Sequence, residues 1–303
     1  MAAPVLLPRD MHDLRERTHG ADTLRVCTFN LLADGLAQNG GFIRCPADAL
    51  SWETRKPLLL AELARCHADV VCLQEVNRLA ELMDSLPGYT AAFLPKRFSP
   101  CTELGFPGDG VALLYAPARL ELLSEPHTHG FVLADGSASP RGVLLQAFVD
   151  KRSSRALVVA CTHLKAKNFD DVREAEATQV LAELERFVVA LGRPCDVLLC
   201  GDFNTVLDSP ALRAVLAHTP RRLQNVQFPP GHFTTWKWRG SEGGAESEKK
   251  LSIDHIFHSE GLRPVSLLSA PADDAVGPGA LPCARYGSDH LAQLAVFEVA
   301  PHA

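Results

Sequence analysis

Short apolar stretches that each end abruptly in a polar residue recur along this chain, and they constrain its fold more than any other feature. Examples are VCTFN, which ends at Asn30, VVCLQE, which ends at Glu75, and VLLCGDFN, which ends at Asn204. Stretches of this length that are apolar throughout are typical of strands buried on both faces of a sheet. Helical patterns stand between them, most clearly over residues 172–191, where apolar residues recur at helical spacing. The sequence therefore predicts an α/β protein of alternating strands and helices.

The expected elements follow from these patterns. We expect strands over residues 24–30, 68–75, 110–115, 142–150, 155–164, 195–204, 253–258 and 291–299, and helices over 51–66, 78–86, 172–191 and after Ser209-Pro210. Regular hydrogen bonding in the first helix should start only near Pro57. Asp171 and Glu174 predict a capping box for the long helix. The stretch SEGGAESEKK, residues 241–250, has no periodicity and is expected to be a mobile loop.

The alternation continues to the end of the chain without an internal linker. We therefore expect one catalytic domain over residues 23–303, preceded by a partly disordered lead-in over residues 1–22 in which a helix could form over 10–19. Five histidines lack any motif context and are expected at the surface: His12, His19, His218, His232 and His258.

Charge and cysteine usage restrict the class of protein. The chain has 30 Lys and Arg against 36 Asp and Glu, a net charge of −6, whereas a protein that coats long nucleic acid is usually basic. The nine cysteines include no C-x-x-C pair, and several lie in apolar runs, so we expect buried free thiols and an intracellular location. That location is the cytoplasm, or mitochondria if a leader precedes this sequence. No run is long and apolar enough to span a membrane, and no secretory signal is present at the start.

The polar residues at the strand ends form a chemically coherent set. Strand ends that share one edge of a layered fold can converge, and ligands bind where they do. The set comprises Asn30, Glu75, His163, Asp202, Asn204, Asp254, Asp289 and His290. Carboxylate and amide oxygens suit Mg²⁺ or Mn²⁺, whereas zinc would favour thiolates. A metal with carboxylates and two histidines is the equipment for hydrolysis of phosphate esters.

Six short pieces in this order resemble one family. They are TFN (28–30), LQE (73–75), THL (162–164), GDFN (201–204), IDHIF (253–257) and SDH (288–290), and they are similar to the endonuclease/exonuclease/phosphatase superfamily, which includes deoxyribonuclease I and apurinic endonuclease. Longer pieces such as FLPKRFSPC, THLKAK, FTTWKWR and LPCARYGSDHL resemble the nocturnin family, in the branch that also holds the carbon-catabolite-repression poly(A) deadenylases. The resemblance implies a four-layer α/β sandwich of two mostly antiparallel sheets flanked by helices.

The resemblance also implies roles for individual residues. Glu75 would hold the metal, Asn30 would help to hold the metal or the phosphate, and Asp289 would serve a second metal or hold a loop. Asp202 would orient or deprotonate the attacking water, and Asn204 would bind the scissile phosphate. Asp254 would pair with His290 and fix its tautomer, while His163 would donate to a phosphate oxygen. Substrate-binding positions would be Lys96, Asp109, Lys165, Lys167 and Arg239, although lysine at 167 replaces the arginine of the family and lacks its bidentate fork.

Two activities fit this resemblance. The first is a Mg²⁺-dependent phosphatase, with Mn²⁺ as an alternative metal, that removes the 2′-phosphate from NADP(H). The second is a 3′-exoribonuclease that shortens poly(A) RNA with the same metal centre. The negative net charge and a few discrete cations favour the first, because a processive RNA enzyme needs phosphate contacts along a groove. A catalytically inactive adaptor is disfavoured because Glu75, Asp202 and His290 are all present. We expect a monomer.

Overall fold

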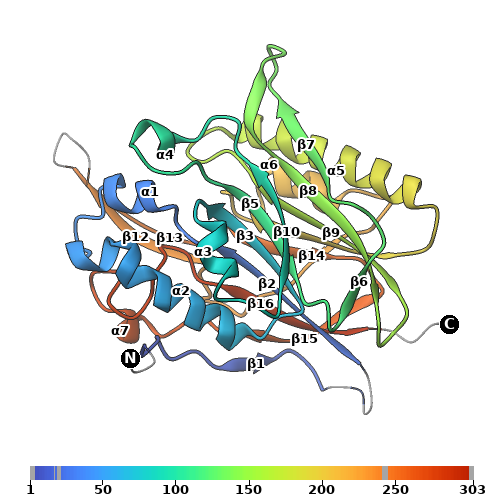
Figure 1. Cartoon of the computed structure of the whole chain (residues 1–303), viewed down its shortest axis with the longest axis horizontal. Coiled ribbons are helices and arrows are strands. Elements are labelled where there is room, and N and C mark those ends of the chain that lie inside the picture. Colours follow the sequence, from blue (N-terminus) through green and yellow to red (C-terminus); the bar gives the residue numbers. More distant parts are fainter. Residues whose placement is uncertain (1–3, 17, 19–21, 241–244, 300–303) are drawn as a thin grey trace.

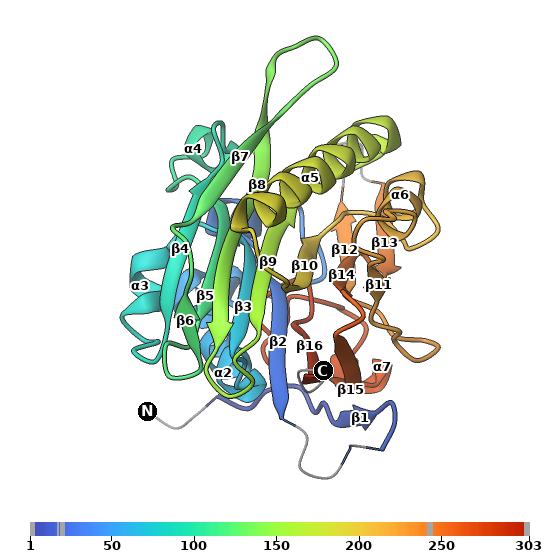
Figure 2. The same ribbon diagram turned by 90° about the vertical axis from the view of Figure 1, so that its right-hand side faces the viewer.

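Two sheets packed face to face form the centre of the molecule (Figures 1 and 2). The structure is a computed structural model and describes residues 4–16, 18, 22–240 and 245–299. The first sheet has seven strands in the order β1 (Met11–Asp13), β15 (Leu262–Leu268), β16 (Gln293–Val299), β2 (Thr23–Asn30), β3 (Val70–Val76), β5 (Gly110–Tyr115) and β4 (Thr90–Pro95). The second runs β11 (Gln224–Asn225), β14 (Asp254–His258), β10 (Asp196–Asp202), β9 (Ala156–His163), β8 (Ala138–Asp150) and β6 (Leu120–Leu122), with β7 (His127–Val132) also paired to β8.

The alternation of side chains along the strands explains why both sheet faces are buried. In β9, Val159 and Cys161 belong to the core between the sheets, whereas Val158 and Ala160 face the outer helices. Pairs β2–β3 and β9–β10 are parallel, and the other strand pairs given for the two sheets are antiparallel. A separate ribbon pairs β12 (Thr235–Gly240) with β13 (Glu246–Leu251).

Helices cover the outer faces of both sheets. Helices α2 (Trp52–Cys66) and α3 (Leu79–Met83) pack on the first sheet, and α5 (Asp170–Leu191) and α6 (Pro210–Leu216) pack on the second (Figure 2). Shorter helices lie in the connections: α1 (Asp34–Asn39), the 3₁₀ helix η1 (Ala47–Leu50), α4 (Pro100–Glu103) and α7 (Asp273–Val276). The order helix, sheet, sheet, helix gives four layers, and it confirms the predicted α/β sandwich.

Three local predictions were wrong. Helix α2 already begins at Trp52, because Ser51 caps it through the backbone N–H of Thr54 and Pro57 is accommodated within it. Helix α5 begins at Asp170 without a side-chain cap, so the predicted capping box is not formed. The predicted loop over 241–250 contains a strand from Glu246, which gains backbone partners from β12; residues 241–244 lie outside the described part of the chain.

The predicted lead-in is part of the fold where the structure describes it. Residues 11–13 form strand β1, which pairs with β15, and not the helix that the sequence allowed over 10–19; Leu7 is fully buried. The guanidinium of Arg9 is buried and donates to the backbone oxygens of Ser269 and Ala292, both at 2.8 Å. These contacts tie residues 7–13 to the first sheet. The disorder predicted for the lead-in otherwise falls on residues 1–3, 17 and 19–21, which lie outside the described residues.

The cysteines agree with the prediction, whereas the histidines agree only in part. None of the nine cysteines forms a disulfide, and Cys27, Cys72, Cys161 and Cys200 are buried as predicted. The surface prediction was wrong for His258, which is 3% exposed, and His232 is half-buried against Gln293; His19 lies outside the described residues. Over the described ranges, no helix combines the length and apolar character that crossing a bilayer requires.

Candidate active site

Strand direction brings the predicted residues to one edge of the sandwich. Because β2 and β3 are parallel, Asn30 and Glu75 lie at neighbouring carboxyl ends, and the same holds for His163 and Asp202 on β9 and β10. Strand β14 runs antiparallel to β10, so Asp254 at its start is directly opposite Asp202. Strand β16 likewise starts beside the end of β2, which places the preceding loop residues at the same edge. The two sheets thus deliver these side chains to a common place.

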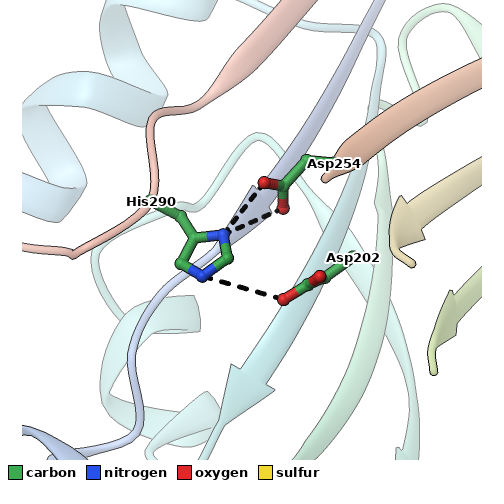
Figure 3. Close-up of side chains that lie close together, drawn as sticks. All are labelled: Asp202, Asp254 and His290. Carbon is green, nitrogen blue, oxygen red and sulfur yellow. Dashed lines mark hydrogen bonds and ion pairs between the residues drawn. The ribbon is translucent and has the colours of Figure 1, made fainter. Parts of the chain in front are cut away.

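His290 lies between two carboxylates, as Figure 3 shows. Its Nδ1 is 2.9 Å from Oδ2 of Asp254, and its Nε2 is 3.8 Å from Oδ2 of Asp202. All three residues are buried, and their potential ligand atoms lie within 4.8 Å of one another. The Asp254 pairing expected from the resemblance is therefore present, and it leaves Nε2 facing Asp202.

Burial and charge set the protonation of this group. Burial alone would lower the pKa of His290, but the carboxylates of Asp254 and Asp202 raise it to about 9. Burial and the nearby Asp254 charge raise the pKa of Asp202 to about 7, against the opposing effect of His290. At neutral pH the imidazole is therefore cationic, and Asp202 exchanges its proton in the range where a general base is most effective.

The two asparagines fix Asp202 from different sides. Nδ2 of Asn30 donates to Oδ2 of Asp202 at 2.9 Å, and the backbone N–H of Asn204 donates to Oδ1 at 2.8 Å. Asn204 has a φ of +53°, and its side-chain amide donates to the carbonyl of Leu164 at 3.0 Å. Part of the amide predicted to bind phosphate is thus already engaged.

Glu75 occupies an irregular end of β3. Its φ is +54°, and the register of β3 against β5 shifts between Leu73 and Val76, so its side chain leaves the normal strand alternation. Oε2 accepts from the backbone N–H of Ala33 at 3.1 Å. Within the described part of the chain no cation forms an ion pair with this half-buried carboxylate, which leaves it able to bind a metal.

Asp289 is engaged by two cations of the β12 ribbon. Its buried Oδ2 lies 2.6 Å from Nζ of Lys237 and 3.2 Å from Nη2 of Arg239. Burial raises the pKa of Asp289, but Lys237, His290 and Arg239 outweigh it and hold the pKa well below its usual range. These contacts favour the second role expected for Asp289, which is to hold a neighbouring segment, over ligation of a second metal.

His163 lies on the other side of Asp202. Its Nε2 is 3.6 Å from Oδ2 of Asp202, and its buried Nδ1 has no hydrogen-bond partner among the described residues. Burial, and then the positive charges of Lys96, His290 and Arg141, lower the pKa of His163 well below the ordinary value. The ring is neutral, so one nitrogen can donate a hydrogen bond to a phosphate oxygen and the other can accept one.

The predicted substrate-binding residues divide into two groups. Lys96 forms an ion pair with Asp109, which is fully buried and also accepts from Ser99, so Asp109 positions the lysine rather than lining the surface. Cζ of Arg239 lies 3.8 Å from the centre of the Phe42 ring, and Nη2 of Arg239 contacts Asp289.

The lysines of the THLKAK segment are more open. Nζ of Lys165 lies 4.7 Å above the ring of Phe169, and Lys167 is exposed with a φ of +69°. The structure therefore gives firm positions to Lys96 and Arg239 beside the centre, and it leaves Lys167 without a described side-chain contact.

Sequence reasoning missed two cations. Nζ of Lys237 is 3.4 Å from Nε2 of His290, and Arg141 is one of the cations that act on His163. Lys237 could have been found, because residues two apart on a strand share a face and Arg239 was already selected. Arg141 lies near the start of an ordinary apolar strand, and the sequence carries no signal for it.

Comparison with known proteins identifies the family. The sequence profile of the Endonuclease/Exonuclease/phosphatase family matches residues 27–290 of this chain. Nocturnin from Mus musculus is 30% identical over 311 residues and nocturnin from Homo sapiens 31% identical over 313 residues, each alignment covering 97% of this chain and 70% of the relative.

Solved structures agree with this. The human nocturnin catalytic domain with bound sulfate anion superposes with a TM-score of 0.74 at 27% identity, covering 96% of this chain and 97% of that one. ANGEL2, described as a 2′,3′-cyclic phosphatase in complex with adenosine-2′,3′-vanadate, superposes with a TM-score of 0.80 at 22% identity over 97% of this chain and 99% of its own, which shows the shared fold. This chain belongs to the Endonuclease/Exonuclease/phosphatase family, among the phosphate-ester hydrolases that resemble nocturnin.

Proposed function

We propose that this chain hydrolyses the 2′-phosphate of NADP(H), releasing NAD(H) and inorganic phosphate. The observation that carries the proposal is the position of Asp202, which is held by Asn30 and Asn204 and faces Nε2 of a cationic His290. A base and an acid thereby lie 3.8 Å apart at the same edge of the sandwich, where both can reach one phosphate group. This arrangement serves hydrolysis of a phosphate ester and needs no nucleophile from the protein.

The donor set fits a hard divalent cation, and we propose Mg²⁺, with Mn²⁺ as a substitute. Glu75 has no cation partner among the described residues, and Oδ1 of Asn30 accepts one backbone hydrogen bond and keeps a second lone pair. These two residues would hold the ion, since oxygen ligands match Mg²⁺ and no thiol is among the residues gathered here. When bound, the ion would neutralise negative charge that develops on the phosphate.

Different side chains of the protein accept and donate the protons of the reaction. Asp202 accepts a proton from the attacking water as the water oxygen bonds to phosphorus. His290, oriented by Asp254, donates from Nε2 to an oxygen of the phosphate or of the departing ribose hydroxyl. His163 and Lys237 contribute hydrogen bonds and charge to the remaining phosphate oxygens. The P–O bond to the ribose breaks, and the 2′-oxygen leaves as the ribose hydroxyl, with its proton coming from His290 where the imidazole acts on the leaving oxygen and otherwise from water.

The distribution of charge supports a compact substrate. Several cations near the centre already have a carboxylate partner, as in Lys96–Asp109 and Arg239–Asp289. They can hold one or two phosphates in fixed geometry, but they do not form the unbroken basic path that a long RNA needs. We propose accordingly that NADP(H) is preferred to poly(A), and that the enzyme acts as a monomer in the cytoplasm.

One assay separates the candidates. Purified protein with Mg²⁺ is incubated with NADPH, with oligo(A) or with adenosine 2′,3′-cyclic phosphate, and release of phosphate, AMP and opened nucleotide is measured at about 150 mM salt. We expect phosphate from NADPH, loss of activity with EDTA, and recovery with Mg²⁺ or Mn²⁺. Ready degradation of oligo(A) without phosphate release from NADPH would establish the exoribonuclease instead. Activity that depends on tightly bound zinc would contradict the proposed metal.

A further inference from the structure

A cavity of about 260 Å³ opens beside His163 and lies outside the group that holds Asp202. It lies between the β4–β5 edge of the first sheet and the β7–β8 hairpin, which projects from the body of the molecule in Figures 1 and 2. One part of the wall is apolar and one part is cationic. The residues used below are Leu94, Lys96, Val111, Phe131, Arg141 and His163.

Arg141 is held in this wall by a buried carboxylate. Its Nε donates to Oε1 of Glu176 at 2.8 Å and its Nη2 lies 2.6 Å from the same oxygen, while Glu176 is only 1% exposed. Nη1 has no hydrogen-bond partner among the described residues. The guanidinium is therefore fixed by two of its nitrogens, and the third is available to a ligand.

The same carboxylate also fixes the segment that follows His163. Oε2 of Glu176 accepts from the backbone N–H of Lys165 at 2.8 Å, and Oε1 accepts from Ser139 Oγ at 3.2 Å. One buried side chain on α5 thus sets the relative positions of Arg141 and Lys165. A fixed guanidinium suits phosphate binding, because its charge-assisted N–H···O bonds to phosphate oxygens are strong and directional.

The backbone holds Arg141 close to the reaction centre. Val143 pairs with Thr162 in the β8–β9 register, and Thr162 Oγ1 donates to the carbonyl of Gly142 at 3.0 Å. A side chain at Gly142 would place its Cβ 2.3 Å from the carbonyl oxygen of His129, so the hairpin can approach this closely only with glycine there. Arg141 and His163 therefore lie on adjacent strands at the same edge.

We propose that this cavity binds a second phosphate group of the substrate, next to the phosphate that is hydrolysed. Arg141 and Lys96 contact the second phosphate, and Leu94, Val111 and Phe131 provide an apolar wall for the attached ring. This inference rests on the proposed function, since it assumes that the reacting phosphate lies by Asp202. The second phosphate comes either from the pyrophosphate of a dinucleotide or from the next phosphodiester of an oligonucleotide.

The test compares substrates with and without a second phosphate. We expect Arg141→Ala to raise KM for NADP⁺ about 10-fold or more, because a charged hydrogen bond is lost, and to change KM for adenosine 2′-monophosphate less than about 2-fold. Arg141→Lys should fall between. Arg152 is an exposed arginine just beyond the opposite end of β8, and Arg152→Ala serves as the matched control that should change neither KM. An equal increase in KM for NADP⁺ and for adenosine 2′-monophosphate in Arg141→Ala would overturn the proposal.

A binding measurement keeps this inference separate from the proposed function. Calorimetric titration with NAD⁺, the trinucleotide ApApA and adenosine requires no turnover when EDTA is present. Tighter binding of NAD⁺ or ApApA than of adenosine, lost in Arg141→Ala, supports the second phosphate site and identifies its source even if NADP⁺ is not hydrolysed. If wild-type protein binds all three alike, or Arg141→Ala binds NAD⁺ and ApApA as wild type does, the proposal is wrong. If the wild-type protein hydrolyses NADP⁺ and Arg141→Ala has the same kinetics, the second phosphate site is rejected while the proposed function stands.

Discussion

Asn30 and Asp202 belong to different sheets, and a 2.9 Å hydrogen bond from the amide of one to the carboxylate of the other joins the two sheets at the active edge. Asn30 is 1% exposed and Asp202 is 1% exposed, so water does not replace this bond. The orientation of the proposed base thus depends on how the sheets pack, and a shift of one sheet against the other would misalign it.

Asn30→Ala should lower kcat/KM by about 100-fold. Without the amide donor, Asp202 loses one of its two fixed hydrogen bonds and its ionised form is less favoured. Far-UV circular dichroism and the melting temperature should stay close to wild type, because the side chain is small. Steady-state kinetics with the substrate from the assay above provide the measurement, and a variant with more than a tenth of wild-type activity would contradict the role of Asn30.

Glu75→Gln and Asp202→Asn should fold and lose activity by several orders of magnitude. The amides keep shape and volume but remove the charge needed to hold a cation or accept a proton. Asp202 is buried beside Asp254, so Asp202→Asn should also raise the melting temperature of the metal-free protein at pH 8.5, where the wild-type carboxylate is ionised. Near-normal turnover in either variant would exclude these assignments.

Stability of the metal-free protein should fall as pH rises from about 6.5 to 9. The pKa of His290 is raised to about 9 and that of Asp202 to about 7, so the folded state binds more protons than the unfolded state in this range. The contribution of His290 to stability is complete below its ordinary pKa near 6.5 and is lost as pH rises through 9. The contribution of Asp202 to stability is lost as pH rises through 7. We expect a loss on the order of 1–3 kcal/mol. Urea unfolding in EDTA gives the measurement, and His290→Gln should flatten the dependence.

Lys237→Ala should lower kcat/KM by about 100-fold, and Lys237→Arg should retain part of the activity. The lysine ammonium is 2.6 Å from Asp289 and 3.4 Å from Nε2 of His290, so its removal takes a cation from beside the proposed phosphate position. Lys249 is directly opposite Lys237 on β13 and is exposed, which makes Lys249→Ala the matched control. Similar kinetics for the two alanine variants would show that Lys237 is not used.

Glu176→Ala should destabilise the fold by about 3–5 kcal/mol, because Arg141 loses its buried partner. Adding Arg141→Ala should restore part of that loss, with a coupling of about 1–3 kcal/mol in a double-mutant cycle. Urea unfolding at neutral pH supplies all four free energies. If the changes in unfolding free energy of the two single variants add up to that of the double variant, the ion pair contributes nothing measurable to stability.

The parts of this protein that sequence could predict are those that neighbouring residues decide. Strands β5 and β16 were predicted within two residues, because an unbroken apolar run and its polar end are local features. The positions of Glu75, Asp202 and His290 at strand ends followed in the same way. The long helix α5 was also predicted from its periodicity, although its capping was not, since the cap depends on the loop that precedes it.

The tertiary structure decided which of these ends meet and what holds them. The two cations that contact Asp289, Lys237 and Arg239, come from β12, which lies some fifty residues away in the chain. Asp109 is a buried partner of Lys96, and Arg141 lies near His163 because β8 pairs with β9, while Glu176 on α5 forms an ion pair with Arg141. The sequence of a single strand shows that its faces are apolar, but it does not show which strands pair with it. Register, sheet packing and the partners of buried charges arise from many weak contacts between distant segments, so they are determined only when the whole chain has folded.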